Sequence, residues 1–151
     1  MPTLVQLSNS TWYIKSPSNV GLYVKDGHVV LIDSGNDKEA GRNILKILKE
    51  KNWELSLIIN THSNADHIGG NEFLQKRTDC RIAATKLEAA FTENPVLEST
   101  MFNCGYPYQR LKNKFLLARA SSVSDIIPNS GQILDTSLTA YSLPGHFLDM
   151  I

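Results

Sequence analysis

The residues with the greatest potential for chemistry lie between Thr61 and Gly70, a stretch that holds two of the four histidines of the chain. Within it, His62, Asp66 and His67 provide imidazole and carboxylate groups, the usual nitrogen and oxygen ligands of zinc and similar divalent metals. In a tight loop these three side chains can point into one space, which indicates a metal site. The same residues are also compatible with a solvated turn in which Asp66 caps the following helix.

A short apolar run, Leu55 to Ile59, comes just before this stretch and must position it. The run is β-branched and unbroken by turn residues, which is typical of a strand buried on both faces. Gly69 and Gly70 follow the candidate ligands, at a point where the backbone must turn or pack closely. The potential ligands therefore stand at the end of a buried strand, where ligands bind in open α/β sheets.

Three motifs together resemble one known family. The stretch T-H-S-N-A-D-H-I-G-G is similar to the T-H-x-H-x-D-H-x-G-G signature of the metallo-β-lactamase superfamily, with Asn64 in place of the second histidine. Residues 31–35 resemble the early strand that ends in an Asp-[Thr/Ser]-Gly turn. Residues 143–146 resemble the later strand whose end supplies another metal-ligand histidine, here His146. Three matches in the same order are far more specific than one.

The resemblance implies an α/β (α+β) fold, the metallo-β-lactamase-like αββα sandwich. Here we expect mainly its N-terminal half, a mixed β-sheet with helices on one face. Family members continue through a second half that supplies further ligands, whereas this chain ends at Ile151. We therefore expect residues 1–151 to form a single, apparently truncated domain. The sheet face that packs on the second half would be apolar and exposed, which predicts a homo-oligomer formed through that face.

The metal-ligand positions within these motifs can each be matched to a residue of this sequence. They imply a site for one or two metal ions, zinc or alternatively iron or manganese, built by His62, Asp66, His67 and His146. Asp66 would also be catalytic, because it would orient the attacking water. Asp33 would brace the metal loop by hydrogen bonds, and Asn64 would contact water or substrate. An amide oxygen binds transition metals poorly, so weak or absent metal occupancy is compatible with this sequence.

Three functions are compatible with these residues. The first is a metal-dependent hydrolase, or its N-terminal half, that uses metal-activated water on a small-molecule thioester, lactam or lactone, or phosphoester. The second is a catalytically degenerate module of the same fold that acts in assembly, which Asn64 favours. The third is a di-iron redox protein, which is the least favoured because position 64 lacks a carboxylate.

Composition excludes several other classes. Lysine plus arginine and aspartate plus glutamate both number 15, and the resulting formal net charge of zero argues against a nucleic-acid partner. The N-terminus lacks the pattern of a signal peptide, and no run approaches the roughly 18 apolar residues of a membrane span. Cys80 and Cys104 stand far apart, which favours free thiols. We expect a cytoplasmic protein without membrane association.

Hydrophobic periodicity predicts the elements that carry these motifs. Strands are expected over residues 4–7, 12–15, 22–25, 28–32, 55–59, 80–84, 123–127, 132–134 and 138–143. Helices are expected over residues 37–51, about 66–76, 85–92 and about 109–119. The dipeptide Asp26-Gly27 between two β-branched runs predicts a hairpin, because both residues tolerate a positive φ.

Local chemistry predicts two helix starts and one loop. Asn36 with Glu39, and Thr85 with Glu88, have the spacing of a capping box, in which each side chain bonds a backbone amide of the first turn. Residues 93–107 are the least regular part of the chain, and we expect a long loop there. Its apolar underside would hold the aromatic residues Phe102, Tyr106 and Tyr108.

Overall fold

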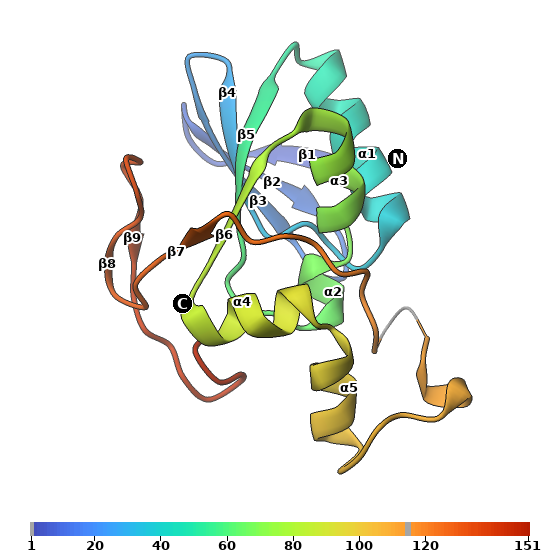
Figure 1. The fold of residues 1–151 in the computed structure, drawn as a ribbon. Helices are drawn as coiled ribbons and strands as arrows, with labels where there is room; N and C mark the ends of the chain where they lie inside the picture. Colours follow the sequence, from blue (N-terminus) through green and yellow to red (C-terminus); the bar gives the residue numbers. More distant parts are fainter. Residues whose placement is uncertain (1, 114–115) are drawn as a thin grey trace.

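The computed structural model describes residues 2–113 and 116–151, and within them a mixed sheet carries helices on one face and a small hairpin on the other (Figure 1). The seven strands of this sheet follow one another in space in the order of the chain. They are β1 (Thr3–Gln6), β2 (Thr11–Lys15), β3 (Val20–Lys25), β4 (His28–Ile32), β5 (Glu54–Ile59), β6 (Arg81–Ala84) and β7 (Asp125–Ile126). The separate hairpin pairs β8 (Gly131–Gln132) with β9 (Thr139–Ala140).

The helices of the described residues lie between the later strands. They are α1 (Lys38–Glu50), α2 (Ala65–Ile68), α3 (Asn71–Thr78), α4 (Lys86–Glu93), α5 (Val96–Phe102) and the 3-10 turn η1 (Gln109–Leu111). Strands β1 to β4 pair antiparallel, and β4 to β7 pair parallel. The predicted hairpin joins β3 to β4, and Asp26 and Gly27 have φ values of 51° and 82°. The parallel strands all end at the same edge, where the loops after β4 and β5 meet.

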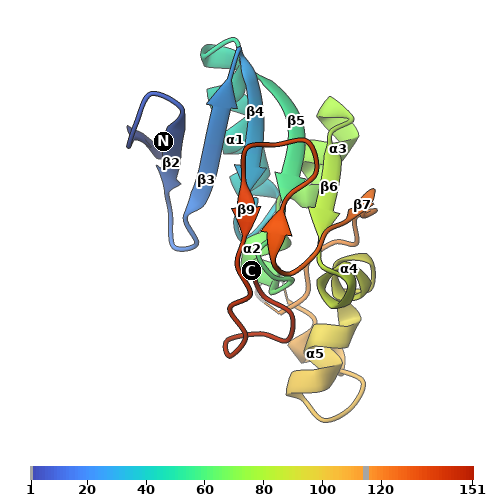
Figure 2. The ribbon, with the colours of Figure 1, turned by 90° about the vertical axis from the view of Figure 1, so that its left-hand side faces the viewer.

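Two apolar cores lie on the two faces of the sheet. On the first face, α1 buries Ile44, Ile47 and Leu48 against the sheet, and α3 packs beside α1. On the second face, Ile133 and Ala140 of the β8–β9 region pack against β5, as Figure 2 shows for the hairpin in front of the sheet. We predicted that this second face would be exposed. That prediction is wrong where the hairpin lies, because residues after β7 fold back over it.

The start of α1 lies one residue later than predicted. Asp37 is the N-cap, and its carboxylate accepts a hydrogen bond from the Ala40 amide at 3.0 Å. Asn36, the predicted cap, belongs instead to the loop that follows β4. Because Asp and Asn cap helices about equally well, the sequence pattern did not distinguish the two neighbours.

The helix predicted over residues 66–76 is two helices, α2 and α3, separated at Gly69 and Gly70. A Cβ atom on Gly69 would lie 2.3 Å from the carbonyl carbon of Asn36, and one on Gly70 would lie 2.4 Å from the carbonyl oxygen of Ser34. The loop after β4 therefore packs directly onto the backbone at this break. As a result α2 is a single turn, which lies between the end of β5 and the loop after β4.

The chain from residue 93 to residue 119 also differs from expectation. Instead of a continuous loop, α5 begins after Pro95, and instead of a helix over 109–119 the described residues contain only η1. Residues 114–115 of that predicted helix lie outside the described residues. Three aromatic residues expected on a buried underside are instead more than half exposed: Phe102, Tyr106 and Tyr108. The predicted apolar underside is therefore wrong.

Two expectations from composition can be compared with the structure. Cys80 is buried, Cys104 is exposed, and both are free thiols, as predicted. None of the helices in the described part of the chain is long and apolar enough to cross a membrane.

Candidate metal centre

The predicted site residues gather at the edge where the parallel strands end. Asp33 follows β4, and the segment after β5 supplies four of them, from His62 to His67. His146 approaches from the C-terminal loop. The ring centroid of His62 lies 4.0 Å from that of His67 and 5.1 Å from that of His146. Residues that are far apart in the sequence, and were matched only by motif, thus form one cluster of three imidazoles.

The His62 imidazole has one nitrogen held and the other without a partner. Its Nδ1 lies 2.9 Å from the Thr61 hydroxyl oxygen, and that hydroxyl donates to Asp33 at 2.8 Å. The hydroxyl oxygen must therefore accept the Nδ1 proton, which leaves Nε2 unprotonated. Among the described residues, Nε2 is buried with no hydrogen-bond partner. Burial, followed by the charge of His67, lowers the pKa of His62 from 6.5 to about 4, so the ring is neutral at pH 7.

The His67 imidazole is held in a similar way by Asp33. Its Nδ1 lies 2.8 Å from Asp33 Oδ2, and its Nε2 lies 3.5 Å from Asp66 Oδ2. Burial alone would lower the pKa of His67, but the hydrogen bond and the charge of Asp33 outweigh burial and raise it above 6.5. Ligand atoms of Asp33, His62 and His67 all lie within 4.8 Å of one another.

Asp33 holds the neighbouring residues of the site in place through its hydrogen bonds. Its side chain is almost fully buried, and its carboxylate accepts from the Thr61 amide, the Thr61 hydroxyl and His67 Nδ1, each at 2.8 Å. Its φ of 64° is in the left-handed region, which aspartate tolerates better than most residues. Because both carboxylate oxygens already accept hydrogen bonds, Asp33 positions the histidines rather than standing free beside them.

Asp66 and its partner lie at the exposed side of the cluster. The Asp66 side chain is 47% exposed, and its Oδ2 accepts a hydrogen bond from the Ser18 hydroxyl at 2.7 Å. Ser18 comes from the loop between β2 and β3, and the sequence analysis did not single it out. The contact spans 48 positions of the chain, so local patterns carry no signal for it.

Asn64 is held by a glutamate that the sequence reading missed. Its Nδ2 donates to Glu98 Oε1 at 2.5 Å, and the Ala65 amide donates to Glu98 Oε2 at 3.0 Å. Asn64 Oδ1 is buried and has no partner among the described residues. Burial raises the pKa of Glu98, and the bonds from Asn64 and Ala65 oppose that rise. Glu98 lies on α5, which the sequence reading placed in a loop.

These residues fit a divalent metal ion. Metal-binding histidines present one nitrogen to the ion and give the other N–H to an oxygen of the protein, which fixes the tautomer and the ring orientation. His62 and His67 both have this arrangement, with Nδ1 held by Thr61 or Asp33 and Nε2 left for a ligand bond. The buried, unpartnered Nε2 of His62 is the clearest sign, since an imidazole nitrogen without a partner is costly to bury.

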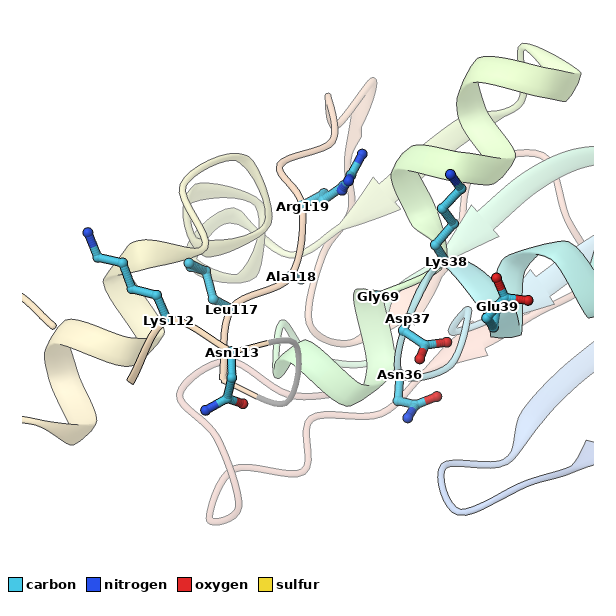
Figure 3. A pocket seen from close by; sticks show the side chains of 10 residues that line it. All are labelled: Asn36, Asp37, Lys38, Glu39, Gly69, Lys112, Asn113, Leu117, Ala118 and Arg119. Atoms are coloured by element: carbon cyan, nitrogen blue, oxygen red, sulfur yellow. The ribbon is translucent and has the colours of Figure 1, made fainter. Parts of the chain in front are cut away.

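A pocket of about 410 Å³ lies beside this cluster, between the start of α1 and residues 112–113 and 117–119 (Figure 3). It approaches the metal loop at Gly69, and none of the three clustered histidines lines it. Lys38 and Lys112 lie on opposite sides of the pocket, and their ammonium groups do not point toward each other (Figure 3).

The fold and the cluster together define a mixed α/β protein with a histidine- and carboxylate-lined site at the end of its parallel strands. The sequence model of the metallo-beta-lactamase superfamily matches residues 13–146. The chain belongs to this superfamily, and both the resemblance and the fold class predicted from the sequence are confirmed.

Curated relatives are named hydroxyacylglutathione hydrolases. The protein of Cereibacter sphaeroides is 45% identical over 51 residues, which are 34% of this chain and 20% of the relative. The protein of Rhodopseudomonas palustris is 39% identical over 66 residues, which are 44% of this chain and 26% of the relative. The matched stretch thus spans only about a quarter or less of these relatives.

Solved structures of similar fold are metallo-beta-lactamases. BJP-1, a subclass B3 enzyme of Bradyrhizobium japonicum, has a TM-score of 0.77 at 20% identity and covers 97% of this chain and 54% of its own. MIM-1 of Novosphingobium pentaromativorans has a TM-score of 0.74 at 21% identity, with 97% and 53% covered. The chain therefore spans about half the length of these structures, and the likeness is one of fold.

Proposed function

We propose that this chain forms the metal centre of a metal-dependent hydrolase. The observation that carries the proposal is the pair of imidazoles, His62 and His67, each held at Nδ1, with Nε2 of His62 buried without a partner among the described residues and Nε2 of His67 facing Asp66. Asp66 and His146 complete the proposed ligand set, with zinc as the proposed metal. When bound, a divalent metal supplies Lewis-acid chemistry, because it lowers the pKa of water to about 7 and polarises a carbonyl or phosphoryl oxygen.

The chain's own residues have distinct roles in this proposal. Thr61 and Asp33 hold the protons on Nδ1 of His62 and His67, and so keep both Nε2 atoms available as ligands. Ser18 fixes the Asp66 carboxylate by its bond to Oδ2. Because half of the Asp66 side chain faces solvent, Asp66 can accept a hydrogen bond from an incoming water and orient it toward the substrate.

A thioester is the proposed substrate class. The curated relatives carry the name hydroxyacylglutathione hydrolase, and their aligned stretches are 39–45% identical to this chain. The metallo-beta-lactamase structures are about 20% identical and support the fold, not a lactam substrate. Lactones and phosphoesters remain alternatives because fold alone does not define the substrate.

Metal content per chain, measured by elemental mass spectrometry on the purified protein, tests the proposal. We expect about one or more zinc ions per chain, lost in His67→Ala, because four protein ligands suffice for a zinc site. His28→Ala is the matched control, since His28 is an exposed histidine on β4 that lies 3.7 Å from Glu54. If the wild-type protein takes up no metal even after zinc is added, the proposal is wrong.

A second candidate function, assembly without turnover, is favoured by the exposed apolar residues beside the β8–β9 hairpin. Tyr141 and Leu143 are 70% and 55% exposed, although they line a mainly apolar pocket of about 250 Å³ with Ile32 and Ile59. We propose that two copies associate through this face. Light scattering on the purified chain, with Tyr141→Ser for comparison, distinguishes the two states. A monodisperse wild-type monomer contradicts the assembly proposal.

A further inference from the structure

The first turn of α4 has the sequence of a capping box but does not form one. Thr85 is the N-cap residue, yet its side chain makes no capping hydrogen bond. Its hydroxyl donates instead to the carbonyl oxygen of Asp149 at 3.0 Å. The carboxylate of Glu88 is likewise bound elsewhere. A capping bond from Ser or Thr contributes about 1 kcal/mol, so this helix start forgoes a stabilising contact in order to bind other segments.

Glu88 joins two segments that are far apart in the chain. Its Oε2 accepts from the Ser63 amide at 2.8 Å and from the Ser63 hydroxyl at 2.6 Å. Its Oε1 accepts from the Asp149 amide at 2.9 Å. Glu88 is fully buried, with no exposed surface. A buried carboxylate requires such donors, because transfer from water without them is very costly. One carboxylate therefore fixes residue 63 at a set separation from residue 149.

The same helix holds the C-terminal loop at further points. Thr85 and Glu88 bind the carbonyl and the amide of the same residue, Asp149. One turn later, the Phe91 ring packs edge-on against Phe147, with ring centroids 5.3 Å apart. Phe147 is buried, whereas His146 beside it is exposed. The backbone on the C-terminal side of His146 is therefore fixed by α4.

We propose that Glu88 is a positioning residue that fixes the loop carrying His146 against the loop carrying His62. Ser63 follows His62 directly, and Asp149 is only three residues after His146. By bonding to both loops, the Glu88 carboxylate keeps the imidazoles of His62 and His146 at the separation that they would need to bind one metal ion. The inference rests on the proposed function only where it concerns metal. The mechanical link between the two loops is independent of it.

The experiment compares Glu88→Gln with wild type and with Glu93→Gln. Glutamine keeps the shape of Glu88, but its NH₂ group cannot accept the bonds that one carboxylate oxygen now receives. Glu93 is the matched control, because it lies on α4 and binds the Val123 amide, away from both loops. Hydrogen exchange of residues 61–65 and 146–150 is measured on metal-free protein, and Co²⁺ titration follows the visible spectrum and affinity.

In Glu88→Gln we expect faster amide exchange in both loops, and a Co²⁺ affinity lower by about tenfold to a hundredfold, the usual effect of losing a partner outside the ligand set. Glu93→Gln should match wild type in both. If Glu88→Gln leaves exchange in residues 146–150 and the cobalt spectrum unchanged, the proposal is overturned. If wild type binds no Co²⁺ but both loops loosen, the proposed function fails and the positioning role of Glu88 is supported.

A second variant keeps the proposal testable if Glu88→Gln does not fold. Thr85→Val removes only the hydroxyl that binds the Asp149 carbonyl and leaves Glu88 in place. We expect faster exchange confined to residues 146–150, with residues 61–65 as protected as in wild type. Unchanged exchange in 146–150 would show that the Thr85 hydroxyl does not hold this loop, and would count against the proposal.

Discussion

Replacement of Asp33 by asparagine tests the bracing of the two imidazoles most directly. Asparagine has the same size and also tolerates a positive φ, so the backbone at 64° is preserved. Its carbonyl oxygen can still accept from some of the three donors that now bind Asp33, but its NH₂ group must face a donor. The hydrogen bond to His67 also loses its charged acceptor. The variant therefore tests the contribution of the carboxylate group while leaving the backbone conformation unchanged.

The expected cost follows from these contacts. A hydrogen bond to a charged group contributes about 1.5–3 kcal/mol, and a buried donor left without a partner costs about 1–3 kcal/mol. Since the two effects overlap, we expect Asp33→Asn to lower the free energy of unfolding by about 2–4 kcal/mol. With a urea dependence of about 1–3 kcal/mol per molar, the unfolding midpoint should fall by roughly 0.7–4 M.

Urea unfolding of the metal-stripped protein measures this loss, and the histidine proton resonances follow the pKa of His67. That pKa should fall in Asp33→Asn, because the hydrogen bond and charge that raise it are gone. Asp26→Asn is the matched control, an exposed turn aspartate with a φ of 51°, for which we expect a change within about 0.5 kcal/mol. A loss below about 1 kcal/mol in Asp33→Asn, together with an unchanged pKa of His67, would refute the bracing role.

Three further changes have defined outcomes. Asn64→His should raise zinc affinity about tenfold or more in calorimetric titration, because Glu98 can accept the new Nδ1 proton and orient the ring; no gain would show that the position does not face the ion. Gly70→Ala should cost about 2 kcal/mol or more in thermal unfolding, since its Cβ would meet the Ser34 carbonyl oxygen at 2.4 Å, and an unchanged melting temperature would contradict that packing. Burial above all holds the pKa of His62 at about 4, so the folded state binds fewer protons than the unfolded chain between about pH 6.5 and pH 4. Metal-free protein should therefore lose stability from this group as the pH falls through that window, by at most about 3.5 kcal/mol at roughly 1.4 kcal/mol per pKa unit, and His62→Gln should remove that loss.

The strands and the site cluster could be predicted because their signals are local or carried by motif. The Asp26-Gly27 turn and the apolar run before Thr61 each define an element from adjacent residues. The ordered motifs around Asp33, His62 and His146 predict that these residues lie at one edge of the sheet. The structure brings these motif residues together because the parallel strands all end at that edge.

The misses share a physical cause, which is that tertiary contacts override local chemistry. A loop was predicted over residues 93–107, but proline also suits a helix start, and α5 begins directly after Pro95. Thr85 and Glu88 match a capping box, but the loops around Ser63 and Asp149 take their hydrogen bonds. Ser18 and Glu98 carry no pattern at all, because each meets its partner only after the chain has folded.

The spatial order of the sheet has a consequence for how the protein is made. Each strand pairs with the one synthesised just before it, so the sheet can grow from its N-terminal edge as the ribosome releases the chain. At about 5–20 residues per second, synthesis from residue 62 to residue 146 takes roughly 4–17 s. During that interval the nascent chain already contains Asp33, His62 and His67, while the third imidazole has yet to be made. Completion of the histidine cluster therefore follows synthesis of the first two imidazoles by this interval, and is reached when the loop carrying His146 docks on α4.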